Sequence, residues 1–175
     1  MLGAVEVPVP EQVAHLRMFA RVDYEDAFCI DTNIARTPRQ WLRAFIEDAP
    51  LWFQVSWIGA ALTVLGAKVG PMHGPDHVLG WRVHYDRPDL FATGLDSIGG
   101  LRARLVALTP PGQALIATQI SLDTAYARTL WPAIRRGHRH FAPYLLDRAA
   151  TRPVRPADSI AGRARHPRQR WTHAR

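Results

Sequence analysis

Apolar and polar positions alternate in four consecutive segments of this chain. The segments cover residues 78–86, 90–97, 101–108 and 114–122, and glycines or prolines separate them. A period of two is typical of an antiparallel strand with one buried face, and the glycines and prolines favour short turns. We therefore predict four antiparallel strands joined by hairpins. The apolar set of the first strand, which we expect to face inward, is Leu79, Trp81, Val83 and Tyr85.

A pattern with a longer period follows the last of these strands. Between Thr124 and about Ala149, apolar residues recur at steps of three and four, which predicts a long amphipathic helix. Pro132 and Pro143 lie within it and lack the backbone donor that a helix interior uses, so we expect a bend or a break. The stripe that faces the core consists of Ala127, Leu130, Trp131, Ile134, His138, Phe141 and Leu145.

The first third of the chain predicts one strand and one capped helix. Residues 24–30 alternate at period two, which indicates a strand with an aromatic inner face. Thr37 can cap a helix whose first position is Pro38, and Gln40 can return the hydrogen bond to complete a capping box. This helix should end near Asp48.

A second helix is predicted over residues 51–65, and it is apolar on most sides. We expect it either to lie deep in the core or to form part of a cavity wall. The apolar window 51–66 is shorter than the roughly 20 residues that a bilayer requires, and it includes polar side chains. We therefore expect no membrane span.

The order of these elements predicts an α+β fold of the helix-grip type. A curved antiparallel sheet would wrap around the long C-terminal helix, and two short helices would follow the first strand. We expect residues 21–150 to form this domain and residues 1–20 to form an extended, proline-containing arm. Residues 151–175 would be a flexible tail rich in Arg and Pro.

The net charge of +7 is concentrated in that tail. Residues 1–150 carry a net charge of +1, whereas residues 151–175 hold seven Arg against Asp158 alone. An Arg-rich tail can bind phosphate backbones or an acidic partner without sequence specificity. The alternative is a solvated extension that has no partner.

Cysteine content and the N-terminal residues indicate the compartment. Cys29 is the single cysteine, so no intramolecular disulfide can form. The first residues lack the basic and apolar regions of a secretory signal. We therefore expect a cytoplasmic protein.

Three phrases resemble a known superfamily. They are Val22-Asp23-Tyr24-Glu25-Asp26-Ala27-Phe28, Asp76-His77-Val78-Leu79-Gly80-Trp81-Arg82-Val83 and Trp131-Pro132-Ala133-Ile134-Arg135-Arg136-Gly137-His138-Arg139. Together with the element order, they resemble the START-like, polyketide-cyclase-type helix-grip superfamily, and more narrowly a bacterial branch of it. The resemblance covers about residues 5–150. It implies a cavity between sheet and long helix that binds apolar small molecules, lipids or polyketide-like intermediates, and some members are cyclases or dehydratases.

The residues that we expect to line this cavity come from the predicted inner faces. An apolar pocket with a few polar groups is the default ligand site of such a fold. The predicted ligand-binding residues are Tyr24, Phe28, Trp81, Val83, Tyr85, Ala103, Leu105, Ile120, Trp131, Ile134 and His138.

His138 is the main candidate for catalysis. It lies on the apolar stripe of the predicted helix, and imidazole titrates near neutral pH, so it can serve as a general acid or base. Tyr85 or Asp96 would assist it. The alternative is a core histidine whose hydrogen bonds are satisfied.

Little in the sequence indicates a metal or cofactor site. His73 and His77 lack ligand spacing, and His138 and His140 point to different sides of a helix. No glycine-rich loop has the context of a phosphate site. Arg82, His84, Arg102 and Arg104 alternate with the inward residues, so they should face solvent.

Three functions from different classes therefore remain open. The chain could bind an apolar or amphipathic small molecule, or it could be a cyclase or dehydratase that uses His138. It could also act as an interaction protein that binds nucleic acid or an acidic partner through residues 152–175.

Overall fold

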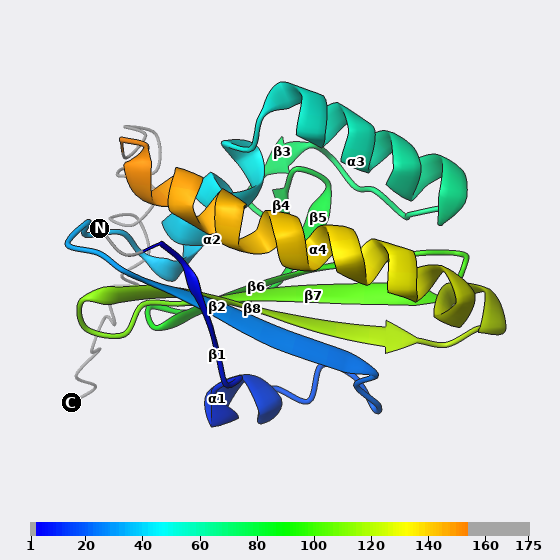
Figure 1. Cartoon of the computed structure of the whole chain (residues 1–175), viewed down its shortest axis with the longest axis horizontal. Helices are drawn as coiled ribbons and strands as arrows, with labels where there is room; N and C mark the ends of the chain where they lie inside the picture. Colours follow the sequence, from blue (N-terminus) through cyan, green and yellow to red (C-terminus); the bar gives the residue numbers. More distant parts are fainter. Residues whose placement is uncertain (1–2, 154–175) are drawn as a thin grey trace, which may run out of the picture.

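The fold is α+β, and a long C-terminal helix lies across a curved antiparallel sheet (Figure 1). The computed structural model describes residues 3–153, apart from the side chain of His73. The elements are β1 (Val5–Val7), α1 (Glu11–Ala14), β2 (Tyr24–Asp31), α2 (Pro38–Glu47), α3 (Leu51–Val64), β3 (His73–Gly74), β4 (His77–Val78), β5 (Trp81–Asp86), β6 (Leu90–Asp96), β7 (Leu101–Leu108), β8 (Gln113–Leu122) and α4 (Ala125–Thr151).

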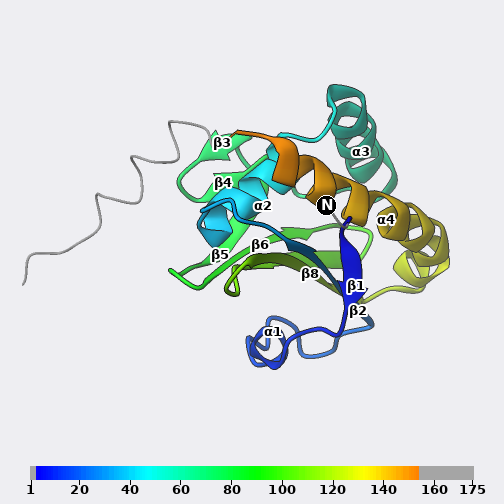
Figure 2. The same ribbon diagram turned by 60° about the vertical axis from the view of Figure 1, so that its left-hand side comes forward.

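The strands form one eight-stranded sheet in the order β1-β2-β8-β7-β6-β5-β4-β3. Neighbouring strands are antiparallel throughout. Helices α2, α3 and α4 cover one side of the sheet, which we call the inner face, and α1 lies on the opposite, outer face (Figure 2). This arrangement confirms the predicted helix-grip architecture.

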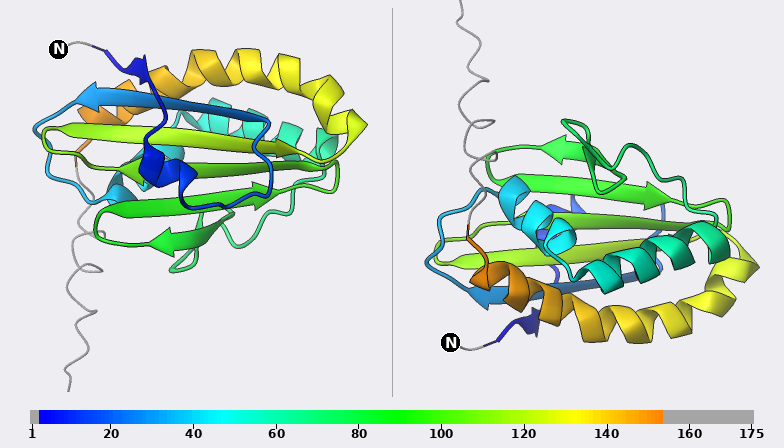
Figure 3. Two further views of the ribbon diagram at one scale, coloured as in Figure 1. Left: turned by 90° about the horizontal axis from the view of Figure 1, so that it is seen from below. Right: turned by 90° about the horizontal axis from the view of Figure 1, so that it is seen from above.

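Helix α4 runs without a break through both of its prolines. It comprises 27 residues, and Thr124 caps it by accepting a hydrogen bond from the backbone amide of Ala127 at 3.1 Å. Figure 3 shows the helix curving along the sheet. We expected a bend or a break at Pro132 and Pro143, and a break does not occur. The residues of its apolar stripe, from Ala127 to Leu145, are buried or half-buried.

Helix α2 forms as its capping pattern predicts. The hydroxyl of Thr37 accepts from the amide of Gln40 at 3.2 Å, and the Gln40 side chain accepts from the Thr37 amide at 2.8 Å. The two bonds satisfy amides that the first helical turn leaves without partners. The apolar stripe of the helix packs into the inner core, where Trp41, Leu42, Phe45 and Ile46 are buried.

The expectation that α3 is a buried helix was wrong. Leu51 is 74% exposed, Trp52 60% and Val55 63%, and Ala61 is the helix's buried residue. The helix is apolar on all sides, but no described element covers its outward side, so only the inward side is buried. Its inward side forms a cavity wall, which was the second expectation for this segment. Within residues 3–153, no helix combines the length and apolarity that crossing a bilayer requires.

The outer face of the sheet carries a second apolar core, which the N-terminal arm covers. The arm adds β1 to the sheet edge beside β2 and then crosses the outer face through α1, where Val13 is fully buried. Ion pairing between Arg139 of α4 and Glu6 of β1 also anchors the arm. The buried members of this outer core are Val13, Ala27, Cys29, Leu90, Ala92, Val106, Leu108, Leu115 and Ala117.

This arm also overturns the expectation that the arginines of β7 face solvent. Arg104 is only 6% exposed, because Phe19 of the arm lies over it with the ring centroid 4.7 Å from the guanidinium carbon. Its Nη1 atom donates to Oδ1 of Asp96 at 2.8 Å. Arg102 likewise lies under Phe19, at 5.4 Å. The arm is therefore part of the packed domain.

Candidate ligand site

A cavity of about 470 Å³ lies between the inner face of the sheet and the helices α3 and α4. Its volume falls within the roughly 300–1,000 Å³ that is usual for small-molecule sites. Aromatic residues of the wall come from α2, α3, β5 and α4, and they are Phe45, Trp52, Phe53, Trp57, Trp81, Trp131 and Phe141. Polar side chains contribute little to its surface, so it suits an apolar ligand.

Most of the predicted ligand-binding residues line this cavity. They come from β5, β7, β8 and α4, whose inner faces converge where the sheet curves around the helix. These residues are Trp81, Ala103, Leu105, Ile120, Trp131, Ile134 and His138.

Three other predicted residues lie on the inner face but outside the cavity wall. Tyr24 and Phe28 of β2 stand next to the His138 ring, with ring centroids 6.3 and 6.4 Å from it. Val83 is half-buried and packs against the inner core. Tyr24 and Phe28 can therefore influence the site through His138, without touching the cavity themselves.

Tyr85 was placed on the wrong face of the sheet. In the pairing of β5 with β6, Val83 lies opposite Thr93 and Tyr85 lies opposite Ala92, so His84 is an extra residue. A bulge of this kind reverses the alternation beyond it. Tyr85 consequently packs against the outer core, and the guanidinium of Arg87 lies 5.1 Å from its ring.

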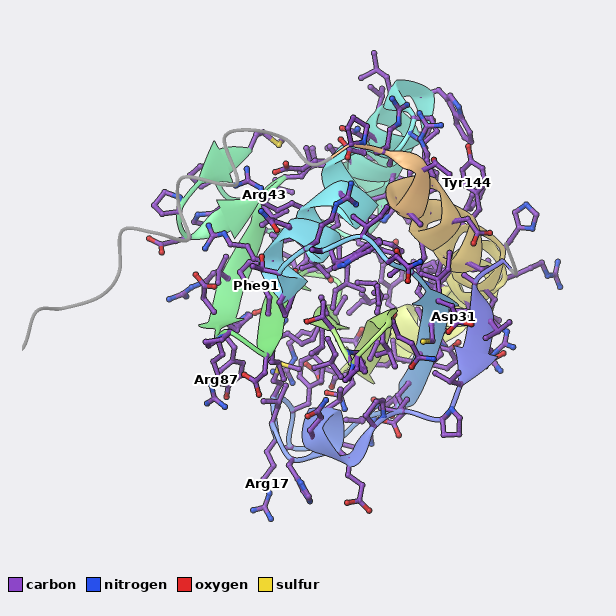
Figure 4. All side chains as sticks on the ribbon, turned by 90° about the vertical axis from the view of Figure 1, so that its left-hand side faces the viewer. Arg17, Asp31, Arg43, Arg87, Phe91 and Tyr144 are labelled. Carbon is purple, nitrogen blue, oxygen red and sulfur yellow. The ribbon has the colours of Figure 1, made fainter. Side chains whose placement is uncertain are left out.

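Asp86, the residue that follows Tyr85, shows the same reversal. Asp86 pairs with Phe91, and Phe91 is fully buried in the inner core on the α2 side of the sheet (Figure 4). The guanidinium of Arg39 lies 5.2 Å from the Phe91 ring and also pairs with Asp86. Tyr85 and Asp86 therefore lie on the faces opposite to those that an uninterrupted alternation along β5 would give them.

Asp96 does not reach the cavity either. It follows Leu95, which lines the cavity, and successive strand residues point to opposite faces. Its carboxylate pairs with Arg104 on the outer face. Neither Tyr85 nor Asp96 is placed to assist His138.

A group of four side chains instead forms a polar corner around His138. We use this name for Tyr24 and Asp26 of β2, Thr118 of β8 and His138 of α4. Nε2 of His138 lies 2.9 Å from Oδ2 and 3.1 Å from Oδ1 of Asp26, and 3.3 Å from the Thr118 hydroxyl. The Tyr24 hydroxyl donates to Oδ2 of Asp26 at 2.6 Å.

Backbone register brings the members of the polar corner together. Asp26 and Thr118 are directly paired across β2 and β8, so their side chains share the inner face. The side chain of Asp26 is 1% exposed and that of His138 is 20% exposed. Asp26 therefore lies behind the imidazole, which itself lines the cavity.

The polar corner keeps Asp26 ionised. Burial of the carboxyl raises its pKa, but hydrogen bonds from His138, Tyr24 and Thr118, together with the charge of His138, outweigh burial, so that the pKa lies below its usual value. Burial and the neighbouring Asp26 raise the pKa of Tyr24. At neutral pH, Asp26 is thus a carboxylate and Tyr24 is a protonated phenol.

This ionisation state determines the tautomer of His138. A carboxylate only accepts hydrogen bonds, so Nε2 of His138 must carry the proton that it shares with Asp26. Among the described residues, Nδ1 has no hydrogen-bond partner. Nδ1 is therefore the ring nitrogen available to a molecule in the cavity.

Sequence reasoning missed Asp26, although a signal was present. Tyr24, Asp26 and Phe28 are two residues apart on one strand, so the alternation that placed the aromatic pair inward also places the carboxylate inward. A carboxylate on a buried face requires a partner. On the same strand, Cys29 lies on the outer face, and burial raises the pKa of its thiol.

Comparison with known proteins assigns no family to the chain. No family model matches it, and no curated protein matches it. Among the side chains that the structure describes, no three His, Cys, Asp or Glu are grouped so that they could hold a metal ion.

Proposed function

We propose that this protein binds an apolar or amphipathic small molecule in the cavity between the sheet and α4. The observation that carries the proposal is the combination of a cavity of about 470 Å³, an apolar wall and a single polar corner. The sequence resemblance to the START-like helix-grip superfamily agrees with it, and membership of that superfamily is part of the proposal.

Burial of apolar ligand surface supplies the driving force in this proposal. Each Å² of apolar surface removed from water contributes about 25 cal/mol, so roughly 300 Å² of ligand surface contributes about 7 kcal/mol. Lost translational freedom offsets part of this gain. A wall that is already formed keeps the remaining cost small.

Entry is proposed along α3. Ser56, Ala60 and Val64 line the cavity and are themselves exposed, so the opening lies beside this helix. The rings of Phe53 and Phe141, 4.9 Å apart, connect α3 to α4 across the site. Movement of α3 away from α4 would widen the opening.

Native mass spectrometry of the purified protein, followed by solvent extraction, is the first test. A stoichiometric small molecule carried through purification supports the proposal and gives the ligand class. The proposal also predicts that the protein binds Nile red, an uncharged dye whose fluorescence rises in apolar sites. Absence of both a carried molecule and dye binding would contradict it.

Two glycines provide a matched pair of variants for the dye test. A Cβ added at Gly137 or at Gly59 meets no atom within 4 Å, and both residues lie within helices. Gly137 lines the cavity, whereas Gly59 does not. Gly137→Phe should therefore fill the cavity and abolish Nile red binding, while Gly59→Phe should retain it. Equal binding by both variants would place the dye elsewhere.

The polar corner favours a second candidate function, acid–base catalysis on a cavity ligand. Asp26 would orient the imidazole and stabilise its protonated form, and Nδ1 of His138 would take a proton from the ligand or return it. A cyclase or dehydratase requires a proton transfer of this type. His138→Asn should abolish turnover while Nile red binding persists, and full turnover by that variant would exclude His138 as the base.

Two earlier expectations stay predictions. Contact with nucleic acid or an acidic partner through residues 152–175 concerns a segment that lies, from residue 154 onward, outside the described residues. Deleting residues 154–175 should remove any salt-dependent binding to such partners, and unchanged affinity would contradict that function. The cytoplasmic location also remains to be tested.

A further inference from the structure

We propose that the cavity selects an uncharged, aromatic molecule that carries one hydroxyl group, which docks on Nδ1 of His138. The inference rests on the proposed ligand-binding function and adds the chemical class of the ligand. Three properties of the cavity carry it: the charge of its wall, the hydrogen-bonding state of the polar corner and the aromatic side chains around it.

The wall carries no formal charge apart from what His138 can hold. Among the described residues, no Lys, Arg, Asp or Glu lines the cavity. A charged ligand group would lose its hydration there and gain no ion pair in return. Two arginines lie beside Tyr24 of the polar corner, and neither lines the cavity: the Arg135 guanidinium stacks 5.1 Å from the Tyr24 ring, and Arg139 interacts with the Tyr24 side chain.

Asp26 cannot compensate a cationic ligand, because its carboxylate is already occupied. It is 4% exposed, and it accepts hydrogen bonds from Tyr24 and His138. Its negative charge also disfavours an anionic ligand at the imidazole, since any positive charge on His138 is already paired with Asp26. Both signs of ligand charge are therefore disfavoured at this corner.

The hydrogen-bonding needs of Nδ1 select a hydroxyl group. Nδ1 is an acceptor when the imidazole is neutral and a donor when it is protonated. A hydroxyl satisfies either state, since it both donates and accepts, whereas a carbonyl satisfies the protonated state alone. Other polar groups of the wall are few. The Gln54 amide already donates to the carbonyl oxygens of Glu47 and Ala49. Ser56 is exposed, and the buried Nε1 of Trp81 has no hydrogen-bond partner among the described residues. One hydroxyl on the ligand is thus sufficient for Nδ1.

Aromatic side chains on several sides of the cavity favour a flat ring system. Trp57 and Trp81 both line the cavity, and their rings are stacked with centroids 5.4 Å apart and an interplanar angle of 17°. Trp131 faces the cavity from α4, beside the polar corner, where its ring meets Tyr24 at 5.0 Å. Aromatic ligands gain stacked and edge-to-face contacts from such walls that a flexible alkyl chain does not.

The test is displacement of Nile red at pH 7 by naphthalenes that differ in one group. We expect 2-naphthol to bind at least tenfold more tightly than 2-naphthoate and (2-naphthylmethyl)trimethylammonium, and several-fold more tightly than 2-methoxynaphthalene. Decan-1-ol, which has the hydroxyl without the ring, should bind more weakly than 2-naphthol. Equal affinity across the set, or a preference for the carboxylate or the ammonium compound, would overturn the inference.

The outcomes separate this inference from the proposed function. If Nile red binds and the naphthalenes displace it without the expected order, the cavity function stands and the ligand class is wrong. If neither the dye nor any naphthalene binds, both fail together. The wild-type protein alone decides between these results.

A pair of histidine variants tests whether His138 is the source of the preference for a hydroxyl group. His138→Phe should bind 2-naphthol and 2-methoxynaphthalene equally, because the hydroxyl loses its partner. His140 lies two residues further along α4 and is exposed, so His140→Phe should retain the wild-type preference. His138→Leu, which likewise lacks a hydrogen-bonding group, serves where the phenylalanine variant fails to fold. A hydroxyl preference that survives in either of these His138 variants would overturn the assignment to Nδ1.

Discussion

Nε2 of His138 lies 2.9 Å from Oδ2 of Asp26, although 112 residues separate the two in the sequence. The carboxylate comes from the second strand and the imidazole from the last helix, so the contact forms only when the sheet closes around α4. It connects the two elements that define the fold. It also orients His138, the one ionisable group among the described residues that line the cavity. We therefore expect the stability of the fold and the proposed function to depend on the same contact.

Asp26→Asn should lower the free energy of unfolding by about 2 kcal/mol, because hydrogen bonds to a charged group contribute about 1.5–3 kcal/mol. Urea denaturation at pH 7 measures the change. The control is Asp31→Asn on the same strand, where the carboxylate is exposed and accepts from Gln113. Equal stability of the two variants would show that the polar corner contributes nothing to folding.

The acid limb of the stability profile should also depend on Asp26. Its pKa is lowered in the folded protein, so its contribution is complete above the unfolded value, about 3.9, and is lost as the pH falls through the folded value. Thermal melts between pH 7 and pH 2 should show a shallower decline in Asp26→Asn than in the wild type. If the melting temperatures of the variant and the wild type declined identically below pH 4, this contribution of Asp26 would be contradicted.

Two tyrosines on opposite faces of the sheet should respond differently to loss of the hydroxyl. Tyr24→Phe removes the donor to Asp26 and should cost about 1–3 kcal/mol of stability. Tyr85→Phe should change stability by less than about 0.5 kcal/mol, since its ring packs on the outer core. Neither variant alters the cavity wall. A loss of Nile red binding in Tyr85→Phe would mean that the bulge in β5 is misplaced.

The N-terminal arm should be essential to the stability of the domain. Val13→Asp buries a carboxylate without a partner in the outer core and should destabilise the protein severely, by several kcal/mol. Val5→Asp, at a position that is 56% exposed, should have little effect. Differential scanning calorimetry measures both variants. An unchanged melting temperature in Val13→Asp would mean that the arm does not pack on the sheet.

Features that depend on neighbours in the sequence were predictable from the residues. The capping box of Thr37 and Gln40 and the alternation along β7 follow from preferences within a few residues. The stripe of α4 follows in the same way, and it placed Trp131 and His138 toward the cavity. The order of these elements was sufficient to predict the helix-grip architecture, because few arrangements bury all of their apolar faces at once.

Other features depend on contacts between distant segments, and local patterns carry little information about them. One extra residue, His84, reversed the face of Tyr85, and only pairing with β6 determines where such a residue is accommodated. Phe19 buries Arg104 because the arm returns across the outer face, and α3 stays exposed because no described element covers it. The pairing of Asp26 with His138 belongs to the same class. Each residue alone indicates a need for a partner, and only the folded chain supplies it.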